Sequence, residues 1–548
     1  MRTSKRILVL IVLVSVMILS ACMGNSNPTH NEDGQVIVRL GKQTSTNPKL
    51  PEGDTFEDNA YSRLAEELLD IELVNEFEAN GEDYERQVAL AISSGELPDI
   101  MQVSLEELKE LKDNDLIADL SEVYEEHASP FIKELYDSYE INPLDDVTFD
   151  GELYGIPAAV NVTAPNMVWV RQDWLDELQP DFDSDGDYFV TLDELERLAM
   201  TFIENDPDNT GNPIGMALSH WFSEPGYGST FTANAMASAK GAYPKNWMFD
   251  GDGNVTYGSL APEMKETLAL ANDWFERGIL DPQFGTRSWD DIMALLVNGE
   301  LGIATGAWHI PDWGLSNVKE MIPDVEFSAF TVVDDKGLIN VPSQNPRGTI
   351  AVVRKDFENP EILMDLVNLF YDTLKNEPKL EEVYPSVYEY QVLDVDGAVR
   401  PLNMEIMRST SELDDYKLIK QAVNGDIDVS EISEARSRSL VSSIMEYKNN
   451  PEEASTAAWA LYHSRMKGLE LGERALESGL VNWENPAFFG STPAIEQYYG
   501  NLSSMEEEEF IKIVTGVEPL DYFDVFVENW YNQGGTEILT EIEEAINQ

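Results

Sequence analysis

Residues 71–103 read IELVNEFEANGEDYERQVALAISSGELPDIMQV, and their pattern sets the fold class that we expect. The apolar and β-branched run over 71–77 predicts a strand, and the amphipathic spacing of 84–94 predicts a helix that ends at Gly95. Residues 97–103 (LPDIMQV) then predict a short buried strand. Strands that alternate with helices favour an α/β architecture over an all-β or an all-helical one.

The residues before this stretch continue the same alternation. Residues 35–41 (QVIVRLG) are typical of a strand, and residues 59–69 have the pattern of a helix. Because helices separate the successive strands, we expect a layer of parallel strands. The sequence contains no internal repeat and no low-complexity segment.

The chain is strongly acidic. Its 548 residues include 102 Asp and Glu against 36 Lys and Arg, which gives a formal net charge of −66 and a pI near 4.1. Such a surface repels phosphate backbones and anionic lipid headgroups, so it excludes nucleic-acid binding through a basic footprint and charge-driven docking on membranes. Hydrophobic residues make up 43% of the chain, enough for a sizeable core in two to four domains.

The N-terminus predicts export and lipid attachment. Basic residues precede an apolar run over 7–19 that is too short to span a bilayer comfortably. Residues 19–22 (LSAC) follow and resemble the bacterial lipobox, and Cys22 is the only cysteine. We therefore predict a signal peptide at 1–21, a lipoprotein carrying diacylglycerol and palmitate at Cys22, and a flexible tether at 22–34. The mature protein would stand on the extracellular face of the cell membrane; the alternative is an ordinary secretory signal with a chance cysteine.

Five further segments resemble one protein family, in sequence and in order. They are 82–100 (EDYERQVALAISSGELPDI), 148–157 (TFDGELYGIP), 167–178 (MVWVRQDWLDEL), 271–284 (ANDWFERGILDPQF) and 521–548 (DYFDVFVENWYNQGGTEILTEIEEAINQ). Their sequences are similar to those of the extracellular solute-binding proteins of family 1, in the lipoprotein branch that serves oligosaccharide ABC importers. The final tryptophan of the family's terminal motif is absent here.

This resemblance implies an α/β fold of two lobes, like that of type II periplasmic binding proteins, with an interlobe cleft and a helix-rich C-terminal part. On that basis we place lobe 1 at 35–160, lobe 2 at 161–342, a return to lobe 1 at 343–405, and a helical part, mostly in lobe 2, at 406–548. The chain would cross the hinge near 157–163 and again near 341–349. The resemblance also implies a monomer that delivers its solute to the transmembrane subunits of an ABC permease.

The residues do not indicate an enzyme. The five histidines lack zinc-ligand spacing, and the sequence has no GxSxG elbow, no thiol besides Cys22 and no P-loop or GxGxxG motif. Paired carboxylates carry no information in a chain with 102 acids. We therefore predict a protein without catalytic activity. A surface-anchored polysaccharide-degrading lyase or glycosidase remains the alternative, and a structural adhesin is a third hypothesis.

One acidic loop, residues 183–194 (DSDGDYFVTLDE), has the ligand spacing of an EF-hand calcium loop. Its positions 1, 3, 5, 7, 9 and 12 are Asp183, Asp185, Asp187, the carbonyl of Phe189, Thr191 and Glu194. Position 6 is Tyr188, where the sharp turn prefers glycine. We expect flanking helices over 169–178 and 193–203 and a structural calcium ion; the alternative is an acidic loop without an ion.

A second acidic loop, residues 206–212 (DPDNTGN), resembles the calcium loop that the family carries after the same helix. The matching ligands would be Asp206, Asp208, Thr210 and Asn212. The family's later acidic ligands are replaced here by Ile214 and Gly215, so this predicted site is less complete.

Sugar binding requires aromatic faces and planar polar groups, so aromatic residues in predicted loops are the candidates. They are Trp308, His309 and Trp313 in 306–313 (GAWHIPDW), Trp221 and Phe222 after an expected strand at 215–219, Tyr154, and Phe488. Trp169, Trp174 and Trp274 have core spacing instead. Arg347 or Arg171 could meet a uronate carboxylate, although the negative body makes an uncharged sugar at least as reasonable.

Together these features predict a membrane-anchored, extracellular solute-binding protein. It would capture an oligosaccharide or another small solute by closure of its lobes and pass it to an ABC permease.

Overall fold

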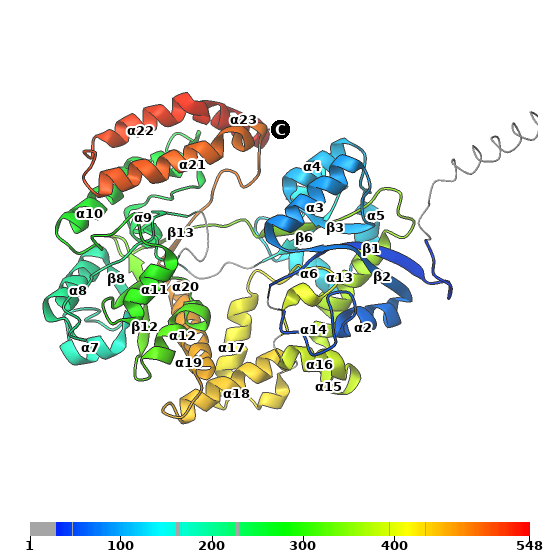
Figure 1. The fold of residues 1–548 in the computed structure, drawn as a ribbon, viewed down its shortest axis with the longest axis horizontal. Helices are drawn as coiled ribbons and strands as arrows, with labels where there is room; N and C mark the ends of the chain where they lie inside the picture. Colours follow the sequence, from blue (N-terminus) through cyan, green and yellow to red (C-terminus); the bar gives the residue numbers. More distant parts are fainter. Residues whose placement is uncertain are drawn as a thin grey trace, which may run out of the picture.

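The computed structural model describes residues 29–46, 48–160, 165, 167–224, 230–393, 395–432 and 434–547. The predicted signal peptide, Cys22 and residues 23–28 of the tether lie outside the described residues, as do residues 161–163 of the first hinge crossing. Figure 1 shows two α/β bodies side by side, with the C-terminal helices on the body opposite to the one that holds β1. Within the described ranges, no helix is long and apolar enough to cross a membrane.

The first body is built on a mixed five-stranded sheet in the order β2-β1-β3-β14-β6. Its strands are β1 (Val36–Gln43), β2 (Ile71–Ala79), β3 (Ile100–Val103), β6 (Ile156–Ala159) and β14 (Arg347–Val353). β1 pairs in parallel with β2 and with β3, as predicted, but β14 is antiparallel to both β3 and β6. The expectation of a wholly parallel layer is therefore wrong, because β6 leaves toward the second body whereas β14 returns from it.

Helices cover both faces of this sheet. They are α2 (Ala60–Leu69), α3 (Gly81–Ser94), α4 (Leu105–Asp113), α5 (Ser121–His127), α6 (Pro130–Asp137), α13 (Glu361–Asn368), α14 (Leu374–Asn376), α15 (Leu380–Val383) and α16 (Pro385–Val392). Asn59 caps the start of α2 by accepting from two backbone N–H groups, and Gly95 ends α3 in the left-handed region. Both helices predicted from the sequence are thus confirmed, and their apolar faces join one hydrophobic cluster drawn from 38–159 and 350–406.

The second body is built on a four-stranded sheet in the order β11-β7-β12-β8. Its strands are β7 (Met167–Arg171), β8 (Phe189–Thr191), β11 (Ile303–Gly306) and β12 (Phe327–Val333). Alternate residues of β7 enter different cores, with Val168 and Val170 in one cluster and Met167 and Trp169 in the other. The period of two along the strand therefore buries both faces of the sheet.

Two groups of helices supply those two cores. One group is α8 (Leu192–Asn205), α9 (Asn234–Lys240), α10 (Pro262–Glu276), α21 (Pro493–Val514), α22 (Tyr522–Trp530) and α23 (Thr536–Ile546). The other is α11 (Trp289–Val297), α12 (Ser316–Met321), α17 (Ser411–Asn424), α18 (Ala435–Asn449), α19 (Thr456–His463) and α20 (Glu470–Ser478). Although α23 lacks the family's terminal tryptophan, Ile538 and Ile542 bury it in the first of these cores.

Two local predictions need correction. Residues 169–171 belong to β7 rather than to a helix, because pairing with β11 and β12 extends the VWVR run; α7 (Gln172–Leu178) begins after it. Residues 215–219 form no strand and only isolated bridges occur, at Ile214 and Met216. Trp169, Trp174 and Trp274 are buried, as predicted.

Three short two-stranded sheets accompany the two main sheets in the described chain. They are β4 (Thr148–Phe149) with β5 (Glu152–Leu153), β9 (Trp247–Phe249) with β10 (Val255–Tyr257), and β13 (Ile339–Pro342) with β15 (Val481–Glu484). The residue boundaries given above for the lobes stay a prediction.

Candidate ligand-binding site

A cavity of about 580 Å³ lies where the first body meets the helices of the second. Tyr61 and Tyr371 line it from the first body's hydrophobic cluster, and Trp308 and Tyr416 line it from the cluster around α17–α20. Pockets between two domains are common ligand sites, and their shape changes when the domains move relative to each other. This cavity is therefore our candidate binding site.

A second hollow, of about 600 Å³, lies on the first body alone. Arg39, Asp99 and Arg354 are among its lining residues, and buried Asp99 accepts a hydrogen bond of 2.7 Å from Arg354 Nη2. Since no residue of the second body lines it, movement of the two bodies would not enclose a ligand there.

Trp308 is held firmly in the wall of the interbody cavity. It follows the end of β11, and only 6% of it is exposed. The guanidinium of Arg465 lies 4.9 Å from the Trp308 ring centroid. Gly468 approaches the backbone of Trp308 so closely that a Cβ atom at position 468 would lie 2.6 Å from the Trp308 carbonyl oxygen.

The buried polar atoms without a hydrogen-bond partner in the described part of the chain include atoms of cavity-lining residues. Nε1 of Trp308 and Oε1 of Gln391 are among them. A buried polar group without a partner destabilises a protein by about 1–3 kcal/mol, so such groups call for an explanation. A ligand that carries hydroxyl groups could pair with both.

The cavity is far less acidic than the rest of the protein. Its lining contains five basic and five acidic residues: Lys49, Lys375, Arg400, Arg436 and Arg465, with Asp396, Glu405, Glu412, Asp415 and Glu434. The whole chain has 102 acids against 36 bases, so this balance is a local enrichment of cations. Burial and the nearby charge of Glu434 raise the pKa of Asp415 to about 6.

The two guanidinium groups of Arg400 and Arg465 are each stacked and paired. Arg400 lies 5.2 Å from the Tyr371 ring centroid and pairs with Glu405. Arg465 lies over Trp308, as described above, and pairs with Asp312. Each cation is therefore held in place by an aromatic face on its own side of the cavity.

Buried Lys42 fixes the turn that carries Arg400. Its Nζ, at the end of β1, donates to the carbonyl oxygen of Ala398 at 2.6 Å and to that of Arg400. Burial, and then the charge of Arg400, lower the pKa of Lys42 to about 7. The turn is thus tied to the central sheet of the first body.

Of the residues predicted to bind the ligand, Trp308 alone lines this cavity. His309 packs edge-on against Trp308, and Trp313 Nε1 donates to His309 Nδ1 at 2.8 Å, but neither residue lines the cavity. Trp221 packs edge-on against His220, with ring centroids 4.3 Å apart. Tyr154 donates to Glu152 and packs against Phe149, away from the cavity lining.

The remaining predicted residues have structural roles. Phe222 is fully buried in the second body's core, where it contacts Phe284 and Phe510. Arg347 Nε donates to Asp146 at 2.7 Å, and Phe488 packs against the same core as Phe222. Arg171 is buried and pairs with both Asp173 and Asp208. Phe222 and Arg171 are thus enclosed by protein atoms in this structure.

The sequence pattern did not reveal most of the cavity. Tyr61, Tyr371, Gln391, Tyr416 and Arg465 come from helical segments that are far apart in the chain. In such segments an apolar periodic residue indicates core packing, and a lone arginine carries no local signal. Only the fold brings these residues together.

Comparisons with known proteins bear on these observations. The family model for bacterial extracellular solute-binding proteins matches residues 47–372, more than half of the chain. The chain belongs to the bacterial extracellular solute-binding protein family.

A relative of this solute-binding protein is the polygalacturonan/rhamnogalacturonan-binding protein YtcQ of Bacillus subtilis strain 168. The two are 23% identical over 471 residues, which cover 85% of this chain and 83% of the relative. An extracellular solute-binding protein of Bifidobacterium longum subsp. infantis shares the fold with a TM-score of 0.64 at 14% identity, covering 95% of this chain and 100% of that one. The calcium-free alginate-binding protein AlgQ2 aligns with a TM-score of 0.57 at 14% identity, covering 95% and 99%. The predicted two-lobe α/β fold and family are thus confirmed, and no comparison supports the degrading enzyme.

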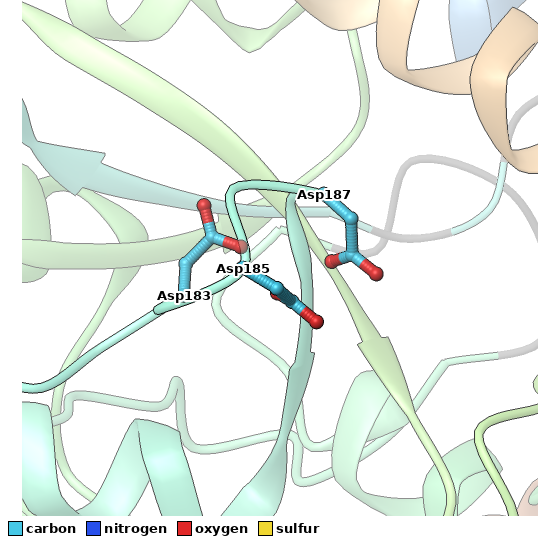
Figure 2. Close-up of side chains that lie close together, drawn as sticks. All are labelled: Asp183, Asp185 and Asp187. Carbon is cyan, nitrogen blue, oxygen red and sulfur yellow. The ribbon is translucent and has the colours of Figure 1, made fainter.

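The first acidic loop of this solute-binding protein brings three carboxylates together. Figure 2 shows Asp183, Asp185 and Asp187 on one tight loop, and each offers an oxygen within 4.8 Å of the others. Tyr188 takes a left-handed φ of 68°, the conformation for which glycine would be preferred. Its ring stacks on Phe330, with the ring centroids 5.5 Å apart.

The predicted ligands of this loop have different roles in the structure: the aspartates repel one another, whereas Glu194 caps a helix. Burial, and then the charges of Asp187, Asp185 and Glu194, raise the pKa of Asp183. A cation would relieve that repulsion. Glu194 instead caps α8, because its Oε2 accepts from N and Oγ1 of Thr191 at 2.9 and 2.8 Å. Phe189 lies in β8 and pairs with Thr331 of β12.

The second acidic loop is already satisfied by protein donors. Asp208 accepts from Arg171 Nη1 at 3.1 Å and from Trp174 Nε1 at 3.2 Å. The oxygens of Asp206 accept from Thr210 and from the backbone of Gly211, and these hydrogen bonds lower the pKa of Asp206. Asn212 donates to Glu300 at 2.9 Å, and its backbone N–H donates to Thr210. The loop holds itself in shape without an ion.

Proposed function

We propose that this solute-binding protein captures an oligosaccharide in the cavity between its two bodies and presents it to an ABC permease. The observation that carries the proposal is the cavity wall, where aromatic faces, stacked arginines and unpaired polar atoms meet. Aromatic faces suit the apolar side of a sugar ring, and polar groups suit its hydroxyls. The name of the Bacillus relative, a polygalacturonan/rhamnogalacturonan-binding protein, supports the same ligand class.

Two series of sugars test the proposal. Galacturonate oligomers would meet the cations Arg400 and Arg465, and neutral galactan oligomers serve as the uncharged counterpart. A ligand that binds only the folded state stabilises it by about 2.7 kcal/mol at one hundred times its Kd, so the Tm should rise. If neither series raises the Tm, the proposal is wrong. Recovery of intact oligosaccharide after long incubation is expected, whereas its depletion would favour a lyase or a glycosidase.

Capture should involve closure of the two bodies about the segments that join them. Because the cavity is lined from both bodies, a bound sugar would contact both and favour the closed arrangement. The radius of gyration from X-ray scattering should therefore fall when ligand saturates the protein. Superimposable scattering curves with and without ligand would argue against closure.

Trp308→Ala is expected to weaken sugar binding about 30-fold, the effect of losing an anchor that contributes about 2 kcal/mol. Calorimetry would measure it. Trp308 also packs in the core, so Trp308→Phe, which keeps an aromatic ring but removes the indole N–H, separates the loss of the N–H group from the loss of the ring. If both variants keep the native Tm and the native affinity, Trp308 does not contact the sugar.

We also propose that Cys22 anchors the exported protein in the outer leaflet of the cell membrane. The signal-like residues that precede it support this assignment. Detergent phase partition of the wild type and of Cys22→Ala tests it: the wild type should enter the detergent phase, and the variant should leave it. Equal partition of the two would refute lipid attachment.

A structural calcium ion at Asp183, Asp185 and Asp187 is a further part of the proposed function. The three carboxylates within 4.8 Å and the left-handed turn at Tyr188 support it. When bound, the ion would supply charge neutralisation and hold the loop ahead of β8. Glu194 would have to leave its capping position to contribute. The second loop, at 206–212, is not proposed as a site, because its carboxylates already have protein partners.

Chelation is therefore expected to lower the Tm of the wild type. A calcium concentration one hundred times the Kd corresponds to about 2.7 kcal/mol of stabilisation. Asp185→Asn should abolish the sensitivity to chelator, since Asp185 is exposed and its substitution leaves the hydrogen bonds of Asp183 and Asp187 intact. Asp252→Asn, in an exposed acidic turn elsewhere, is the matched control and should stay sensitive. Identical melting of the wild type with calcium and with chelator would show that the loop binds none.

A further inference from the structure

A row of aromatic rings leads from the cavity to the surface of the second body. The ring centroids of Trp308 and His309 are 5.1 Å apart, and those of His309 and Trp313 are 6.1 Å apart. Trp313 then stacks on Trp289 of α11, with centroids 5.7 Å apart and planes 27° from parallel. The row is continuous with the wall of the candidate binding site, because Trp308 belongs to both.

Trp313 is exposed and at the same time fixed. Its exposed fraction is 43%, although its Nε1 donates to His309 Nδ1 at 2.8 Å and its ring rests on Trp289. Trp483 in β15 is exposed to a similar extent, 42%, but within the described residues it stacks on no other ring. An indole held with part of its surface in water needs no reordering to bind a ligand, so little side-chain entropy is lost on binding.

We propose that Trp313, supported by Trp289, forms an outer subsite that stacks on a further sugar ring of the oligosaccharide whose inner part lies against Trp308. The proposal rests on the proposed function and adds a chain-length specificity to it. A flat aromatic face fits the apolar side of a sugar ring, and ring contacts through His309 connect this face with Trp308 in the cavity wall. Short ligands would occupy the cavity alone, and longer ones would reach Trp313.

The surroundings of Trp313 suit a sugar better than a purely apolar partner. His309, the ring between the two tryptophans, is partly buried, and burial lowers its pKa. With Nδ1 accepting from Trp313, the neutral imidazole carries its proton on Nε2. Asp312, adjacent to Trp313, pairs with Arg465 of the cavity, so the outer ring and the cavity share one polar network.

The experiment measures affinity against chain length. Calorimetry with galacturonate and galactan oligomers of two to six units is applied to the wild type, Trp313→Ala, Trp313→Tyr and Trp483→Ala. In the wild type, affinity should rise with length. Trp313→Ala should lose about tenfold for the long oligomers and leave the shortest unchanged, as expected for one stacking contact of about 1.4 kcal/mol. Trp313→Tyr should restore most of the loss, and Trp483→Ala should bind as the wild type does.

The possible outcomes separate the subsite from the function beneath it. If the wild type binds neither series, the proposed function fails, and the subsite with it. If the wild type binds but Trp313→Ala has native affinity at every oligomer length, the subsite alone is overturned. This holds even if Trp313→Ala lowers uptake by cells, because that result would indicate a contact with the permease instead. An equal loss for short and long oligomers, together with a lower Tm, would also overturn it, because Trp313 would then act through the fold.

Discussion

Glu326→Ala is expected to lower the free energy of unfolding by about 3 kcal/mol, because it strands several buried donors at once. Glu326 immediately precedes β12, and its carboxylate accepts four hydrogen bonds from the surrounding helices. They come from Lys319 Nζ at 3.0 Å, Tyr447 Oη at 2.9 Å, Trp459 Nε1 at 3.1 Å and His463 Nε2 at 2.9 Å. One carboxylate therefore joins α12, α18 and α19 to the sheet.

The same carboxylate makes stability depend on acid pH. Burial alone would raise the pKa of Glu326, but hydrogen bonds and charges from His463 and Lys319 lower it from 4.5 to about 2. Because the folded-state pKa is depressed, this contribution is fully present above pH 4.5 and is lost as the pH falls toward 2. The side chain is 34% exposed, so solvent screening reduces the contribution to about 2 kcal/mol.

Chemical denaturation at pH 7 and at pH 3 measures both effects. The gap in unfolding free energy between the wild type and Glu326→Ala should be widest at pH 7 and should narrow at pH 3. Glu320→Ala, an exposed change on α12, should stay within about 0.5 kcal/mol of the wild type at both pH values. Equal stability of the wild type and Glu326→Ala at pH 7 would contradict the role of Glu326 as a shared acceptor.

The parts of the fold that sequence predicts are those with local causes. Asn59 and Gly95 mark the ends of helices through hydrogen bonds and backbone conformation within a few residues, and both were placed correctly. The direction of β14 could not be predicted, since it depends on where the chain returns from the second body. Likewise, only pairing with β11 and β12 makes residues 169–171 a strand.

Only the loop that carries Trp308 could be predicted from the sequence as part of the candidate site. Trp308 stands in GAWHIPDW, directly after a strand, and that position singled it out. Arg400 and Arg465 carry no motif, and Gln391 lies on a helix whose pattern shows no binding role. Phe222 and Arg171 looked equally suitable in the sequence, but Phe222 packs against Phe284 in the core and Arg171 is held by acidic neighbours. Whether such a residue can contact a ligand depends on its burial and on its partners from distant parts of the chain, and local sequence spacing shows neither.

Glu506→Gln is expected to stabilise the protein at neutral and alkaline pH by up to about 3 kcal/mol. Glu506 lies on α21 inside the core of the second body and is fully buried, with Ser259 Oγ donating to its Oε1 at 2.9 Å. Burial raises its pKa from 4.5 to about 7, although the charge of Lys245 and the hydrogen bond from Ser259 favour the ionised form. Lys245 forms its ion pair with Glu507, at 2.7 Å, and not with Glu506.

The folded state holds the proton of Glu506 more tightly than the unfolded state does, so ionisation of Glu506 destabilises the fold. Since the folded state keeps the proton of Glu506 up to about pH 7, the contribution of Glu506 to stability should be most favourable below pH 4.5, fall as the pH rises from 4.5 to about 7, and stay reduced above that. A difference of about 2.5 between the two pKa values corresponds to about 3 kcal/mol, and glutamine, which is never charged, avoids the loss.

Glu506→Gln should therefore match the wild type in unfolding free energy near pH 4.5 and exceed it at pH 8 in denaturant melts. Glu508→Gln, an exposed change on the same helix, should show no such divergence. Parallel stability curves for Glu506→Gln and the wild type across this range would mean that Glu506 is already solvated when it ionises.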